Sequence, residues 1–188
     1  MGKIYLFNLI TLDGFFEGPH KWEVGWHNVD DEFREFAVEQ LNSTDILVFG
    51  RITYEGMASF WTTPEAAKND PIVAHQMNSL PKIVFSRTLK EASWNNTTLI
   101  RENAADEMMK LKAQGGKDIG ILGSANLAAS LMQQNIVDEF RIMVNPVILG
   151  KGNPLFEGIR EKIGLKLLRT RSFKSGNVLL HYAPGGSV

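Results

Sequence analysis

No cysteine occurs in the 188-residue chain. This absence excludes disulfide bonds, thiol catalysis and thiolate metal sites, and it fits a reducing compartment. The sequence also contains neither a Gly-x-Ser-x-Gly nucleophile elbow nor a Walker phosphate loop. The four histidines, at positions 20, 27, 75 and 181, lack the short spacing of metal ligands. We therefore expect no bound metal.

The sequence also lacks an excess of charge of either sign and any apolar run long enough to span a membrane. It has 20 Lys and Arg against 21 Asp and Glu, for a formal net charge of -1. No basic block is interleaved with aromatic residues, so nucleic acid is not an expected partner. The N-terminus has no cationic region followed by a long apolar core. We expect a soluble, cytoplasmic protein without a membrane partner.

The residues that are present predict one α/β domain over residues 1–188. The composition is 44% hydrophobic and 22% charged, which is ordinary for a globular protein, and no repeat or linker divides the chain. Helical and strand-like periodicities alternate along the first two-thirds. Strands are expected at residues 3–11, 46–49, 81–85, 97–101 and 118–122. Helices are expected at residues 30–41, 52–60, 65–80 with a break at Pro71, 104–113 with Asn103 as cap, and after residue 124.

The last part of the chain changes character. Residues 137–144, 166–173 and 177–183 alternate in polarity and read as strands separated by Gly- and Pro-containing turns. Such a pattern is typical of antiparallel strands. The fold class is therefore α/β, with a mostly parallel central sheet and antiparallel C-terminal strands.

Three of the expected strands end in short polar or glycine-containing loops. Loop residues at the carboxyl ends of parallel strands meet at one edge of a sheet, where ligands bind. Two of these loops open a helix, whose N-terminus carries unpaired N–H groups and a positive dipole end. The alternative is an ordinary strand–helix junction with a solvated arginine. The candidate residues for an anionic nucleotide are Gly50, Arg51, Thr53, Ser86, Arg87, Thr88, Gly123, Ser124, Ala125 and Asn126.

Four of these loop residues have further expected roles. Gly123 lets the backbone approach a ligand closely, and Ser124 can cap the helix that follows. Arg51 and Arg87 would bring two guanidinium groups to the same edge. Together the loops suit a ligand with more than one phosphate, such as a dinucleotide with an extra 2′-phosphate.

The segment 15–28 is unusually aromatic for a loop, because it contains Trp22 and Trp26. It is either a mobile flap over a pocket or a loop packed on the core. The two indoles could stack on a flat heterocycle or fill the core.

The sequence resembles the dihydrofolate-reductase-like superfamily, in particular the branch of the C-terminal reductase domain of the bifunctional riboflavin-biosynthesis deaminase/reductase. The matching stretches occur in the family's order and cover nearly the whole chain. They are residues 11–14 (TLDG), 50–55 (GRITYE), 86–88 (SRT), 122–127 (LGSANL), 137–139 (VDE), 146–152 (PVILGKG) and 154–156 (PLF). The resemblance implies a three-layer fold, NADPH as cofactor and a homodimer with the late strands as interface.

The resemblance also implies roles for the candidate residues. Arg51 and the pair Ser86-Arg87 would hold the 2′-phosphate of NADPH. Thr53 and the turn at 123–126 would hold the pyrophosphate. The first strand and the turn at 12–14 would lie beside the nicotinamide.

The substrate is left open by the resemblance. Dihydrofolate reductases bind the pterin through a carboxylate on the first helix, for which Asp30 is a candidate here, although it equally suits a helix cap. Phe33 marks the apolar face of that helix and is a further substrate candidate. The zinc-binding motif of the deaminase half is absent.

We expect hydride transfer from NADPH to a C=N or C=O bond of a small pyrimidine- or pterin-like substrate. The enzyme that the chain resembles is 5-amino-6-(5-phosphoribosylamino)uracil reductase. Asp13 is the candidate proton donor, because it follows the first strand, and its alternative role is a turn residue before Gly14. The alternative function is a non-catalytic, dimeric nucleotide-binding module that retains the cofactor pocket.

Overall fold

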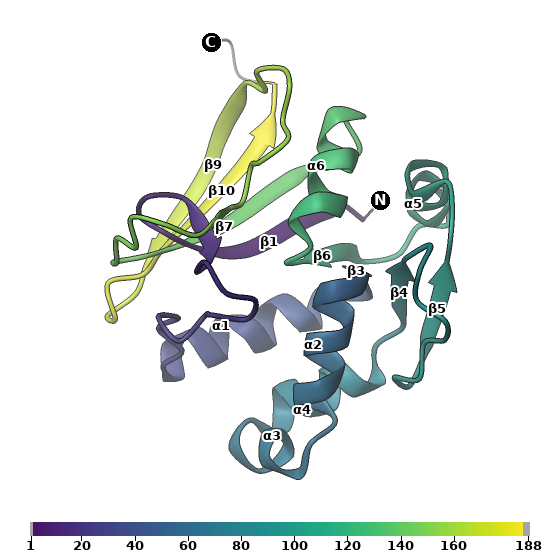
Figure 1. Ribbon diagram of the computed structural model, residues 1–188, viewed down its shortest axis with the longest axis horizontal. Coiled ribbons are helices and arrows are strands. Elements are labelled where there is room, and N and C mark those ends of the chain that lie inside the picture. Colours follow the sequence, from purple (N-terminus) through teal and green to yellow (C-terminus); the bar gives the residue numbers. More distant parts are fainter. Residues whose placement is uncertain (1, 186–188) are drawn as a thin grey trace.

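The computed structural model describes residues 2–185, which form an eight-stranded sheet with helices on both faces (Figure 1). The sheet has the strand order β5-β4-β3-β6-β1-β7-β10-β9. Its strands are β1 (Ile4–Thr11), β3 (Thr44–Gly50), β4 (Lys82–Phe85), β5 (Thr97–Ile100), β6 (Asp118–Leu122), β7 (Glu139–Asn145), β9 (Leu165–Ser172) and β10 (Val178–Pro184). A separate two-stranded sheet pairs β2 (Phe15–Glu17) with β8 (Asn153–Pro154).

The sheet is mostly parallel, and its antiparallel pairs lie at the C-terminal end of the chain, as predicted. β1 pairs in parallel with β6 and with β7. β10 runs antiparallel to both β7 and β9. Residues 137–144 were expected to be one of the antiparallel strands, and this expectation is corrected: they form β7, which runs parallel to β1. Its antiparallel partner, β10, is the strand that reverses direction.

Two layers of helices cover the sheet. Along β1, Ile4 and Leu6 pack in the core beneath α5 (Ala104–Ala113) and α6 (Ala125–Gln133). Tyr5 and Phe7 point to the opposite core, beneath α1 (Asp31–Asn42), α2 (Arg51–Trp61) and α4 (Pro71–Ser79). Successive side chains of a strand face opposite sides, so a strand covered on both faces needs an almost continuous apolar run. The result is the three-layer arrangement seen in Figure 1.

The helix boundaries follow local chemistry. The helical segment 65–80 is interrupted at Pro71, as predicted. α3 (Pro64–Asn69) ends before this proline, and α4 begins at it. Asp30 caps α1, because its Oδ1 accepts a hydrogen bond of 2.8 Å from the N–H of Phe33. Asn103 stands at the N-cap of α5 but has a φ of 56° and no side-chain capping bond, so its predicted capping bond is wrong.

None of the helices between residues 2 and 185 is both long enough and apolar enough to cross a membrane.

Candidate functional site

A cavity of about 1310 Å³ opens at the carboxyl ends of β3, β4 and β6 and beside the middle of β1. The predicted loops converge on it because these four strands are neighbours in the parallel part of the sheet. All of the residues predicted to bind the nucleotide line this cavity: Gly50, Arg51, Thr53, Ser86, Arg87, Thr88, Gly123, Ser124, Ala125 and Asn126.

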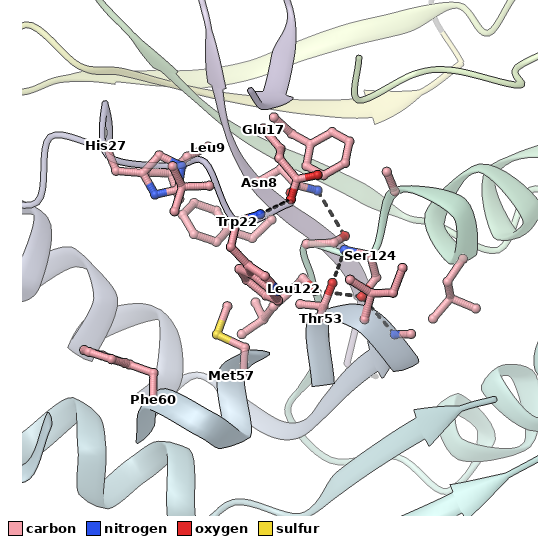
Figure 2. A pocket seen from close by; sticks show the side chains of 18 of the residues that line it. Asn8, Leu9, Glu17, Trp22, His27, Thr53, Met57, Phe60, Leu122 and Ser124 are labelled. Atoms are coloured by element: carbon pink, nitrogen blue, oxygen red, sulfur yellow. Dashed lines mark hydrogen bonds between the residues drawn. The ribbon is translucent and has the colours of Figure 1, made fainter. Parts of the chain in front are cut away.

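The two strand–helix junctions are joined through Ser124 (Figure 2). Its Oγ accepts a hydrogen bond of 2.9 Å from the N–H of Gly50 and donates one of 3.0 Å to the carbonyl of Leu122. Its own N–H donates to Oγ1 of Thr53 at 3.0 Å. The prediction that Ser124 caps α6 through its side chain is therefore wrong. At its φ of 60° the residue instead ties the start of α6 to the start of α2.

Both helix N-termini at this junction present open backbone donors to the cavity. The N-cap residues of α2 and α6, Gly50 and Ser124, make no side-chain bond to their own helix. Their first-turn N–H groups and the positive ends of two helix dipoles therefore remain to stabilise an anion. The hydroxyl of Thr53 accepts from Ser124 and keeps its own proton for donation. The arrangement fits a ligand with two linked phosphates.

Two arginines extend the positive end of the cavity. Arg51 makes only a loose, half-exposed pair with Glu55, at 3.4 Å from Oε1. Arg87 follows β4, and its guanidinium has no partner among residues 2–185. Ser86 shapes that loop by accepting hydrogen bonds from the N–H groups of Thr88, at 3.2 Å, and Leu89, at 2.9 Å. These guanidinium groups are available for a further phosphate, because neither is held in a close ion pair.

Asn8 is a site residue that the sequence reasoning missed. It lies in the middle of β1, is 5% exposed, and lines the cavity. Its Nδ2 donates to the carbonyl of Gly123 at 3.1 Å and so fixes the turn that starts α6. The available signal was a single amide within the apolar run of eight residues that forms the strand.

Gly123 is required by its neighbours as well as by any ligand. Its φ is +59°, and a Cβ at this position would lie 3.0 Å from Cγ2 of Thr53. A side chain here would be strained and would push against the residue that bonds Ser124. Gly123 therefore lies close to Thr53, and its close approach to a ligand stays a prediction.

The segment 15–28 lies over the cavity. The N–H of Trp22 donates to Oε2 of Glu17 at 2.8 Å, and Oε1 of the same carboxylate accepts from Nδ2 of Asn153 at 2.7 Å. The indole of Trp22 rests against Gly56, where an added Cβ would collide with Cζ2 of the ring. Trp22 therefore lines the cavity from above α2, as Figure 2 shows. Movement of this segment as a flap stays a prediction.

The substrate candidates divide into two groups. Trp22 and Phe33 line the cavity. Trp26 and Asp30 do not belong to its lining: the Trp26 indole donates to the carbonyl of Glu23 at 3.2 Å, and Asp30 caps α1. Of the two roles that the sequence allowed for Asp30, helix cap and pterin-binding carboxylate, the structure shows the helix cap.

Asp13 also lies outside the lining of the cavity. Its Oδ1 accepts hydrogen bonds from the hydroxyl of Thr11 at 2.6 Å and from the N–H of Leu149 at 3.2 Å, and its Oδ2 accepts from the N–H of Gly150 at 2.7 Å. These bonds, the one from Thr11 foremost, hold the pKa of the Asp13 carboxyl below its usual value. Asp13 is therefore an ionised turn residue that joins the end of β1 to a distant loop. Its position outside the cavity lining does not support the expected role of proton donor.

His27 is a second cavity residue that the sequence reasoning did not select. Its Nε2 is buried and has no hydrogen-bond partner among residues 2–185. Burial lowers the pKa of this imidazole to about 4, so it is neutral at pH 7. In the same part of the chain, no group of three or more His, Cys, Asp or Glu side chains is arranged to hold a metal ion.

Comparison with known sequences gives one family. Residues 2–179 match the model of the RibD C-terminal domain. An uncharacterised protein of Bacillus subtilis strain 168, YyaP, is 36% identical to this chain over 182 residues, which cover 96% of this chain and 94% of YyaP.

Comparison with solved structures shows the dihydrofolate-reductase-like fold. A protein of Shewanella sp. PV-4 assigned to riboflavin biosynthesis has a TM-score of 0.76 at 22% identity, covering 97% of this chain and 99% of that one. The Thermotoga maritima deaminase/5-amino-6-(5-phosphoribosylamino)uracil reductase has a TM-score of 0.68 at 16% identity, covering 98% and 57%. The dihydrofolate reductase of Enterococcus faecalis, complexed with NADP(H), has a TM-score of 0.65 at 14% identity, covering 97% and 96%. The resemblance and the fold expected from the sequence are confirmed.

Proposed function

The chain belongs to the RibD C-terminal domain family, and from this premise we propose that it is an NADPH-dependent reductase. It would transfer hydride to a C=N or C=O bond of a small heterocyclic substrate. The observation that carries the proposal is the pair of helix N-termini without side-chain caps, joined through Ser124 and flanked by Arg51 and Arg87, at one end of a large cavity.

The residues of this chain would bind and orient the cofactor. Arg51, Arg87 and the hydroxyl of Ser86 would bind the 2′-phosphate, since a guanidinium fork matches phosphate geometry. Thr53 and the first-turn amides of α2 and α6 would bind the pyrophosphate. When bound, the reduced nicotinamide supplies the hydride.

The remaining lining residues would prepare the substrate end of the cavity. The segment 15–28 would exclude water from the site by lying across it, with Trp22 seated on α2. Asp13 is engaged elsewhere and His27 is neutral at pH 7, so the proton that accompanies the hydride would come from water.

The proposal is tested by titrating the protein with NADPH and NADH while following tryptophan fluorescence. We expect the wild type to bind NADPH more tightly than NADH. The substitution Arg51→Ala should weaken NADPH binding by at least about tenfold, because a charged hydrogen bond to phosphate is lost. It should leave NADH binding nearly unchanged. Arg160→Ala, which removes an exposed arginine outside the cavity lining, is the matched control.

If Arg51→Ala weakens the binding of NADPH and of NADH equally, Arg51 does not bind the 2′-phosphate. If the wild type binds neither nucleotide, the reductase proposal itself fails.

A non-catalytic nucleotide-binding module is the second candidate. It is favoured by one observation: Asp13, the candidate proton donor, is a turn residue outside the cavity lining. An enzyme should oxidise NADPH in the presence of a carbonyl or imine compound, whereas a binding module should show affinity alone.

A further inference from the structure

The cavity has two ends with different chemistry. Thr53 stands in the first turn of α2, and Phe60 lies about 10 Å further along the helix axis, at the other end of the cavity (Figure 2). This far end is built from α1, the second half of α2, α4 and the segment 15–28. Its lining is mainly apolar and includes Phe33, Leu41, Met57, Phe60, Val73 and Met77.

The far end offers no unpaired cation. Among the described residues, the charged donors that line the cavity are three arginines, and two of them belong to the phosphate-binding end. The third, Arg34, is held between two carboxylates: its Nε lies 2.7 Å from Oδ1 of Asp70, and its Nη1 lies 2.8 Å from Oδ1 of Asp31. Asp70 also lines the cavity. A phosphate at this end would lose its hydration without gaining a cationic partner.

Trp22 forms a flat wall at the boundary between the two ends. Its φ of 64° is unusual for a residue with a large side chain, and such strain persists where the surroundings hold it. Its N–H is held by Glu17, and Gly56 lets the ring lie directly on the backbone of α2. Trp22 is 39% exposed and lines the cavity. A flat aromatic ring in this position presents a stacking surface.

Two neutral polar groups complete the lining. Oε1 of Gln40 is buried without a hydrogen-bond partner among residues 2–185, and the residue is 7% exposed. Nε2 of His27 is buried without a partner in the same way. Gln40 and His27 both line the cavity, and neither supplies a positive charge at pH 7.

We propose that the substrate is a flat, uncharged aromatic or heterocyclic carbonyl or imine compound without a phosphate group, and that Trp22 is the residue that stacks on it. This inference rests on the proposed reductase function and narrows its substrate class. The proposed substrate class differs from that of a reductase that acts on a phosphoribosyl compound. The difference follows from the pairing of Arg34 with Asp31 and Asp70, because this pairing leaves the substrate end without a free cation.

The test uses two probes that differ only in a phosphate, 2-naphthol and 2-naphthyl phosphate, titrated by calorimetry into the full chain saturated with NADPH. We expect 2-naphthol to bind at least about tenfold more tightly than its phosphate ester. Asp70→Asn should reduce the ratio of the two dissociation constants by about fivefold or more, because it frees Arg34 to bind the phosphate. Asp31→Asn, which removes a fully exposed partner of the same arginine, is the matched control and should reduce it less.

The stacking role is tested with the same probes. Trp22→Ala should weaken 2-naphthol binding by about tenfold, and Trp22→Phe should restore most of it, because the phenyl ring keeps a stacking face. Phe156→Ala removes an aromatic side chain of similar exposure outside the cavity lining and should change binding by less than about twofold. Circular dichroism of each variant verifies that it is folded.

The substrate-class inference is overturned if the phosphate ester binds as tightly as 2-naphthol, or if neither probe binds. The stacking role is overturned if Trp22→Ala binds 2-naphthol as the wild type does. These outcomes are separate from failure of the reductase proposal, which the NADPH titration decides. If NADPH does not bind, the two probes are compared on a nucleotide-free Arg51→Ala, Arg87→Ala double variant, which lacks the two cations of the other end, and the same criteria apply.

Discussion

At the scale of single residues, burial and hydrogen bonding decide which side chains of the site carry charge. His27 sits in an apolar part of the cavity and loses its charge, because burial lowers its pKa to about 4. Asp13 keeps its charge, because three hydrogen bonds stabilise the carboxylate. The carboxyl group of Asp13 is therefore ionised and structural, and the imidazole of His27 lines the cavity in its neutral form.

The neutral state of His27 predicts a pH dependence of stability. Its pKa is 6.5 in an unfolded chain and about 4 in the folded protein, so between these values the unfolded chain binds more protons. The free energy of unfolding should therefore decrease as the pH falls from 6.5 to 4, by up to about 3 kcal/mol from this residue. Urea unfolding at pH 7, 5.5 and 4 should show a smaller decrease for His27→Gln than for the wild type.

His20→Gln is the control for this measurement, because it removes an imidazole that is exposed and lies outside the cavity lining. Identical pH profiles for the wild type and His27→Gln would show that the buried imidazole does not contribute.

At the scale of elements, the site is a junction of two strand–helix turns. The carboxyl end of β3 and the carboxyl end of β6 are adjacent, so the starts of α2 and α6 come together. Ser124 bonds to Gly50 and Thr53, and Gly123 packs against Thr53. A change in either turn therefore moves donors that belong to the other.

This coupling predicts different effects for two glycines with similar backbone angles. Gly123→Ala places a Cβ 3.0 Å from Cγ2 of Thr53, whereas Gly150→Ala, at a φ of +74°, meets nothing within 4 Å. Both variants should lose about 1 kcal/mol of stability, because an alanine is strained at positive φ. Gly123→Ala alone should also weaken NADPH binding, by about fivefold or more, since it displaces Thr53.

The measurement is urea unfolding together with a fluorescence titration of NADPH. The coupling would be disproved if both variants bound NADPH as the wild type does.

At the scale of the whole molecule, β9 is an unfinished edge of the sheet. It pairs with β10 on one side only, and nearly all of its residues are exposed, including Leu165, Leu167 and Leu168. An open strand edge with exposed leucines can pair with a second copy of the chain. Figure 1 places β9 and β10 on the side of the sheet away from β4 and β5, so such pairing would leave the β3 and β4 end of the cavity open.

The homodimer expected from the family resemblance is thus predicted to form through β9. Sedimentation of the wild type should give twice the 21.0 kDa mass of the chain. Leu167→Lys should shift the protein toward monomer, because it places a charge in the interface. Ile72→Lys changes a residue that is similarly exposed, 60% against 50% for Leu167, but lies on α4, and it should leave the dimer intact. A monomeric wild type would contradict the prediction.

Local patterns in the sequence were enough to predict the fold class, most element boundaries and the loops that line one end of the cavity. The apolar runs specify strands covered on both faces, Pro71 separates two helices, and the three loops follow strands of one parallel sheet. These features could be predicted because each depends on residues that are neighbours in the chain. The polar Asn8 within β1 carried the same kind of signal and was overlooked.

Contacts between distant residues were decided only by the tertiary structure. Asp13 is bound by Leu149 and Gly150, Arg34 is paired with Asp70, and Trp22 lies on Gly56. The protonation of His27 likewise depends on burial by several elements. No periodicity or motif reports such contacts, because hydrogen-bond partners, burial and the charge of a side chain depend on which segments meet in space. For this reason the sequence alone predicted the loops that meet at one end of the cavity, whereas the apolar lining and the paired arginine of the other end emerged only once the chain was folded.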